Sequence, residues 1–93
     1  MARHQEPIRV PHETWVELTN SDAVNITFQV LEGQVETYKA GAVQPASGTR
    51  GWLYRLGQAE RNIPLAEIAN GAGTRIWAYG AGYPHSTVLV DHA

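Results

Sequence analysis

The sequence contains no cysteine, which excludes disulfide bonds, thiolate zinc sites and thiol nucleophiles. It has a single lysine, Lys39, beside six arginines, and its formal net charge is −2. Phosphate-binding proteins usually present a basic patch or stripe, and the scattered charges here do not predict one. Nucleic acid is therefore not an expected partner.

Long apolar runs are also missing. No stretch approaches the ~18 consecutive apolar residues of a membrane span, and the opening MARHQEPIRV lacks the apolar core of a secretory signal. These features predict a soluble protein that is made in the cytoplasm and has no membrane partner.

The chain has 93 residues, which predicts one domain over 1–93 with a single hydrophobic core. A chain of this length buries only about 60 to 65% of the surface that its unfolded form exposes, so its stability is marginal. Because disulfides cannot add support, contacts between subunits are the favoured source of extra stability, and we expect an oligomer.

Alternation of apolar and polar residues dominates the chain and is typical of strands with one buried face. It is clearest over 25–30, where Ile26, Phe28 and Val30 point one way. Further strands are expected over 8–10, 15–18, 35–40, 52–56, 75–79 and 87–90.

Turn-forming residues separate these segments. Gly33 suits a short hairpin between residues 30 and 35, and 57–62 is expected to be a polar turn. The sequence GAVQPASGTRG over 41–51 predicts the longest loop, and Leu65 to Ala69 predicts at most one helical turn.

Seven to eight short antiparallel strands with turns about every ten residues predict an all-β domain. Small β-sandwiches, jelly-roll-like ones included, and small barrels have this pattern. No sustained 3.6-residue period supports a helix bundle or a parallel α/β sheet.

No arrangement of histidines, serines or carboxylates in the sequence is typical of an enzyme. The histidines lack the close spacing of zinc ligands, the serines do not lie in nucleophile turns, and the glutamates are dispersed over a domain too small for a deep cleft. The histidines are His4, His12, His85 and His92, and the serines are Ser21, Ser47 and Ser86. We expect no catalytic residue, no metal and no cofactor.

Aromatic residues are the more informative group. Trp52 and Tyr54 share one face of their strand, and Trp77 and Tyr79 share one face of theirs, opposite Ile76. Strands with apolar residues on both faces need two covers, which favours a second sheet on one side and a partner subunit on the other. An exposed platform that stacks on sugars or bases is the alternative.

The whole chain resembles small virion proteins encoded among the structural genes of tailed phages and prophages. The resemblance is carried by MARHQE, ELTNSDAVNITFQV, AGAVQPAS, YRLGQAERNIPL, RIWAYGAG and VLVDHA. It implies a small β-sandwich protein of the virion, made in the host cytoplasm and without catalytic residues. A homotrimeric capsid decoration or cement protein that clamps the major capsid protein is the expected function; a tail-fibre or baseplate component is the alternative, as is a carbohydrate-binding module.

We hypothesise that an extended N-terminal arm, residues 1–11, and the loop 41–51 contact the capsid or another virion protein, because ends and long loops reach beyond a sandwich. The residues expected to bind a partner are Arg3, His4, Ile8, Val10, Val43, Gln44 and Pro45. An aromatic interface, or stacking on a glycan, would use Trp52, Tyr54, Trp77 and Tyr79.

Overall fold

The computed structural model describes residues 4–67, 70–71 and 73–92. These residues form strands and one short 3-10 helix, η1 (Leu65–Glu67). The strands are β1 (Glu6–Pro11), β2 (Trp15–Glu17), β3 (Asn25–Glu32), β4 (Gln34–Ala40), β5 (Trp52–Arg55), β6 (Ala59–Pro64), β7 (Asn70–Gly71), β8 (Arg75–Gly80) and β9 (His85–His92).

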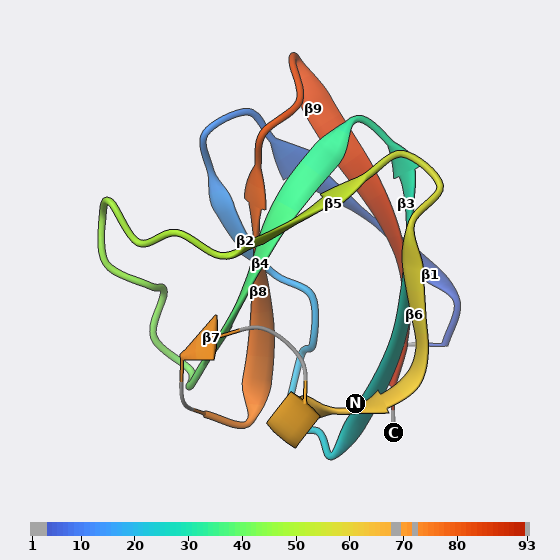
Figure 1. Ribbon diagram of the computed structural model, residues 1–93, viewed down its shortest axis with the longest axis vertical. Helices are drawn as coiled ribbons and strands as arrows, with labels where there is room; N and C mark the ends of the chain where they lie inside the picture. Colours follow the sequence, from blue (N-terminus) through green and yellow to red (C-terminus); the bar gives the residue numbers. More distant parts are fainter. Residues whose placement is uncertain (1–3, 68–69, 72, 93) are drawn as a thin grey trace.

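The strands build two sheets that face each other (Figure 1). Sheet I has the order β1-β9-β3-β6, and sheet II has the order β2-β8-β4-β5. Neighbours within both orders are antiparallel, and the two-residue strand β7 adds a parallel pairing to β4. The predicted all-β sandwich is therefore confirmed.

The pairing follows a nested pattern. β1 pairs with β9, β2 with β8, β3 with β6 and β4 with β5. One long antiparallel hairpin thus wraps around the core, which is the arrangement of a jelly roll. Along the described residues the two sheets share no ladder, so the fold is a sandwich and not a closed barrel.

The core lies between the sheets and comes from alternate residues of the strands. In β3, Ile26, Phe28 and Val30 are buried, as the alternation predicted. In β8 the buried residues are Ile76, Ala78 and Gly80, of which the first two contribute apolar side chains. A one-residue slip of either strand would turn these apolar sets toward solvent, so burial fixes the register.

The hairpin predicted between residues 30 and 35 is not formed. β3 and β4 lie in different sheets, so Gly33 carries the chain across the sandwich. Its φ of 69° is in the left-handed region, and a Cβ there would collide with the Ser86 side chain. Glycine is therefore required by the conformation and by the close approach of β9.

A second correction concerns residues 57–62, which were expected to be a turn. The turn is short, and β6 begins at Ala59. A bulge places two residues of β6, Arg61 and Asn62, opposite Thr27, and the Asn62 amide donates to Thr27 Oγ1 at 2.7 Å. The bulge and the polar sequence AERNIP remove the alternation that would have revealed the strand.

The predicted helical turn over 65–69 lies only partly within the described residues. The expected helical turn is η1, which ends at Glu67; its predicted continuation, Ile68 and Ala69, lies outside the described residues.

In the part of the chain that the structure describes, no helix has the length and apolar character needed to cross a membrane.

Candidate binding surfaces

The outer face of sheet II carries a cluster of aromatic rings. Trp15 of β2 lies beside Tyr79 of β8 with ring centroids 5.2 Å apart, and beside Tyr38 of β4 at 6.3 Å. Trp77 lies on the same face, because the register pairs it with Tyr38. Ile76 and Ala78 point to the opposite, buried face. The aromatic surface predicted from β8 is thus the outside of sheet II.

The loop 41–51 is tied to this face by a carboxylate. Glu36 of β4 is 7% exposed although its side chain points outward. Arg50 donates to both Glu36 oxygens, from Nε and Nη2, at 3.0 Å each, and the Gly51 amide donates to Oε1 at 3.1 Å. These hydrogen bonds, led by those from Arg50, lower the pKa of Glu36 against the opposing effect of burial.

The other end of the loop is also held. Trp77 Nε1 donates to the Gly41 carbonyl at 2.9 Å, and Pro45 is buried. At Gly51 a Cβ would collide with the Thr37 backbone, so the absence of a side chain lets the loop rejoin the sheet closely. The loop is therefore a fixed wall at the side of sheet II; in Figure 1 it projects on the side where β2 lies.

A hollow of about 510 Å³ opens between this wall and the start of β2. Its lining combines aromatic rings, carboxylates, hydroxyls and an amide. The lining residues are Glu13, Thr14, Trp15, Glu36, Gln44, Ser47, Gly48, Thr49, Arg50 and Tyr79. Its volume falls within the range of about 300 to 1,000 Å³ that is typical of small-molecule sites.

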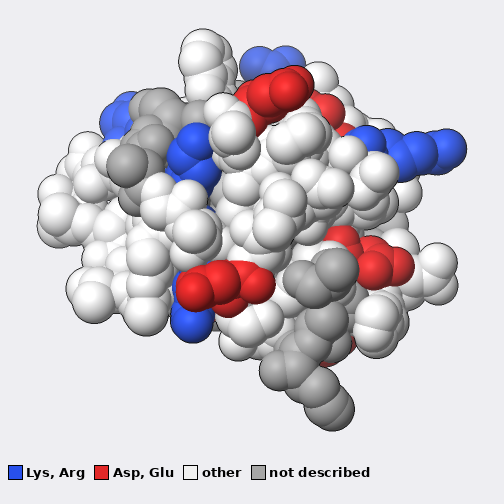
Figure 2. Space-filling model, turned by 90° about the horizontal axis from the view of Figure 1, so that it is seen from below, with Lys and Arg blue, Asp and Glu red and all other residues white. Residues whose placement is uncertain are grey.

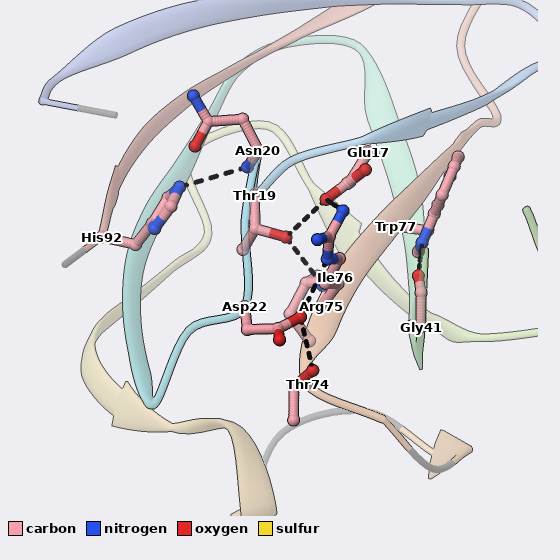
Figure 3. A network of polar contacts seen from close by, with 10 residues as sticks. All are labelled: Glu17, Thr19, Asn20, Asp22, Gly41, Thr74, Arg75, Ile76, Trp77 and His92. Atoms are coloured by element: carbon pink, nitrogen blue, oxygen red, sulfur yellow. Dashed lines mark hydrogen bonds and ion pairs between the residues drawn. The ribbon is translucent and has the colours of Figure 1, made fainter. Parts of the chain in front are cut away.

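A network of polar contacts fixes the adjacent edge of sheet II (Figure 3). Arg75 of β8 donates to Glu17 Oε2 at 3.3 Å and to Asp22 Oδ1 at 3.0 Å. Thr74 donates to the same Asp22 oxygen at 2.8 Å. The hydrogen bond from Arg75, followed by that from Thr74, lowers the pKa of Asp22. The connection from β2 to β3 is thereby pinned to β8.

Two buried groups extend this network toward sheet I. Thr19 donates to Glu17 Oε2 at 3.2 Å and accepts the Ile76 amide at 3.3 Å. His92 of β9 accepts the Asn20 amide at Nε2 at 3.3 Å (Figure 3). These contacts join residues 17–20 to β8 of sheet II and to β9 of sheet I. The role of Thr19 and His92 is therefore structural.

The second notable surface surrounds edge strand β5. Trp52 is 64% exposed and Leu56 is 65% exposed; Leu53 and Leu31 are also exposed. Leu31 is the extra residue of a bulge in β3, and its neighbour Val30 exchanges hydrogen bonds with Gly57 and Gln58, which brings Leu31 to the β5–β6 turn. We call Leu31, Trp52, Leu53 and Leu56 the β5 patch.

The residues expected to bind a partner are separated in the structure. Ile8 and Val10 of β1 are buried in the core, so their side chains cannot reach a partner in the folded protein. Residues 6–11 are thus a strand of sheet I and not an extended arm. His4 is exposed, with Nδ1 at 3.7 Å from Asp91 Oδ1. Arg3 lies outside the described residues.

The loop residues and the aromatic residues are divided as well. Val43 and Gln44 are exposed, whereas Pro45 is buried. Trp52 belongs to the β5 patch. Tyr54 instead points into the sandwich, where its ring lies 4.9 Å from Phe28 and its hydroxyl donates to Glu60 at 2.9 Å.

Sequence reasoning missed several members of these surfaces. Trp15 and Tyr38 belong to the aromatic cluster, and the alternation of their strands could have placed them opposite the core residues. Leu31 belongs to the β5 patch because a bulge turns it outward, and nothing in the local sequence signals that bulge. The partnership of Glu36 with Arg50 joins a strand to a loop 14 residues away, and spacing alone does not reveal it.

Charges of both signs are scattered over the face that Figure 2 shows. Figure 2 views the end of the sandwich where the chain termini lie, and small acidic and basic groups alternate there with wide uncharged areas. Within residues 4–67, 70–71 and 73–92, no three histidine or acidic side chains gather into a possible metal site.

No protein-family model matches the chain, and no similar protein was found among the curated proteins or the solved structures.

Proposed function

We propose that the protein is a structural component of a phage virion, a capsid decoration protein that binds shell subunits through the β5 patch. The observation that carries this proposal is the gathering of four exposed apolar side chains on and beside one edge strand. Exposed apolar side chains concentrated at one sheet edge are typical of sites of protein contact.

The four sheet edges differ in a way that supports this role. β1 carries Pro7 and Pro11, and β6 carries Glu60, Arg61 and Pro64, which are residues that discourage pairing with another chain. β2 is only three residues long, and its Trp15 is buried.

β5 has the sequence WLYR and is paired, among the described residues, on one side only, with β4. Its apolar side chains lie on both faces of the strand at the sheet edge. A partner strand could therefore add to the edge while its side chains pack on Trp52 and Leu53.

The class of partner rests on the whole-chain resemblance to small virion proteins. A jelly roll is compatible with it, since viral capsid proteins use this fold, but lectins and cupins use it too. We further propose that the protein is a trimer that attaches to the major capsid protein. Association through several copies would let weak individual contacts add up to stable attachment.

The test is binding to phage shells assembled from the same genome with this gene deleted. We expect the double variant Trp52→Ala/Leu56→Ser to co-sediment with shells at no more than a tenth of the wild-type occupancy. The control is Val24→Ser, which removes an even more exposed apolar side chain beside Leu65, at the far end of β6 from the β5–β6 turn.

Equal occupancy of the double variant and the control would refute binding through the β5 patch. Recovery of the protein on tails and not on heads would instead assign it to a tail fibre or baseplate. Light scattering of the purified protein tests the trimer, which should have about three times the 10.2 kDa mass of one chain.

A further inference from the structure

We propose that the hollow between the loop 41–51 and the outer face of sheet II is a binding site for a neutral saccharide. Its floor contains the half-buried ring of Tyr79, which is backed by the buried ring of Trp15, and its walls come from the residues around Glu13 on one side and from the loop on the other. Its volume of about 510 Å³ accommodates a sugar ring with its hydroxyl groups.

The lining matches the two kinds of surface that a sugar ring presents. The Tyr79 ring offers a flat apolar area against which the C–H face of a pyranose can pack. Gln44 supplies two donors and an acceptor, Ser47 and Thr49 supply hydroxyls, and Glu13 supplies an acceptor only. A ring stacked on the floor would thus find hydrogen-bonding partners at the rim.

The charges of the site favour a neutral ligand over an anion. Glu13 and Glu36 are both acidic, and the cation of the lining, Arg50, already forms a two-point pair with Glu36. A phosphate or carboxylate would have to compete with Glu36 for this guanidinium and would approach Glu13. Neutral hydroxyl groups avoid both costs.

The walls are formed before any ligand arrives. The Arg50 pair, the Trp77–Gly41 hydrogen bond and buried Pro45 hold the loop in place. Binding therefore does not require the loop to be ordered, which lowers the entropic cost of a small ligand's modest contact area.

The hollow and the β5 patch share no residue, so the two proposals can fail independently. The hollow faces out from β2, β4 and β8, whereas the patch follows β5 and its neighbouring turn. A protein attached to a shell through β5 could present this hollow to glycans of a cell surface.

The experiment is a screen of the wild-type protein on an array of neutral oligosaccharides. Isothermal titration and saturation-transfer NMR with the methyl glycosides of glucose, galactose, mannose and N-acetylglucosamine follow. We expect binding of at least one of these sugars, with NMR contacts to the aromatic protons of Tyr79 or Trp15.

Three variants place the ligand. Tyr79→Ala should raise Kd at least tenfold, and Ser47→Arg, which puts a long side chain into the hollow from an exposed loop position, should abolish binding. The control Trp52→Ala removes an exposed aromatic ring outside the hollow and should leave Kd within twofold of wild type.

Because Tyr79→Ala removes a ring that packs on Trp15, its fold is checked by NMR, and Ser47→Arg gives the same answer without that risk. The proposal is overturned if no neutral saccharide binds, or if binding survives Ser47→Arg. It is also overturned if Trp52→Ala abolishes binding. Ser47→Arg should still bind shells, which separates failure here from failure of the decoration function.

Discussion

At the scale of single residues, Glu36 shows how an outward-facing side chain can become structural. It lies on the solvent side of sheet II, yet Arg50 and the Gly51 amide enclose its carboxylate. An apolar residue at this position would leave the Gly51 amide without its partner. The carboxylate therefore stabilises the loop that forms one wall of the hollow.

This arrangement predicts a stability that depends on acid pH. The pKa of Glu36 is lowered from 4.5 in the folded protein, so its contribution is present above that value and is lost as pH falls through the folded pKa. We expect Glu36→Gln to cost about 1 to 3 kcal/mol at pH 7. Urea unfolding at pH 7 and pH 3 measures this.

The pH dependence separates Glu36 from the other carboxylates. Asp22 and Glu32 also have lowered pKa values, and both remain in the variant. The difference in free energy of unfolding between wild type and Glu36→Gln should therefore shrink as pH falls. A difference that stays constant from pH 7 to pH 3 would show that the charge of Glu36 plays no part.

At the scale of elements, β1 makes residues 6–11 a strand of sheet I. It pairs with β9 over six residues, from Glu6 with Val90 to Pro11 with His85. Ile8 and Val10 are buried, and burying a side chain of this size contributes about 1.5 to 3 kcal/mol. β1 is thus part of the folding unit.

Deletion of residues 2–10 should therefore unfold the protein and not simply remove a contact. Losing both side chains and the pairing with β9 takes away a large share of a total stability of about 5 to 14 kcal/mol. Circular dichroism melting should show no cooperative transition. Deletion of residues 2–5, which leaves β1 intact, should melt as wild type does; cooperative melting of the longer deletion would contradict this role of β1.

The sequence predicts an element well where one face of a strand is buried and the other is solvated. β3 meets this condition, and its buried residues were identified from alternation alone. β8 has apolar residues on both faces, so alternation separated Ile76 from Trp77 and Tyr79 but did not indicate which set faces the core. β6 does not meet the condition, because its bulge at Arg61 and Asn62 interrupts the alternation. The crossing at Gly33 could not be inferred either, since a glycine turn serves a hairpin and a change of sheet equally well.

At the scale of the whole molecule, the jelly roll brings together residues that are far apart in the chain. The hollow combines β2, β4, the loop 41–51 and β8, and the β5 patch combines the end of β3 with β5 and its turn. Local patterns identified Gln44, Trp52 and Tyr79 as members of possible surfaces. Their neighbours depend on which strands pair, and the local sequence does not encode that.

The central claim is that β5 contacts the shell, and a cryo-electron microscopy reconstruction of particles carrying the protein tests it most directly. We expect jelly-roll density on the outside of the head with Trp52, Leu53 and Leu56 against the capsid protein and the loop 41–51 facing outward. Density that leaves β5 exposed to solvent, or the absence of the protein from the particle, would contradict the claim.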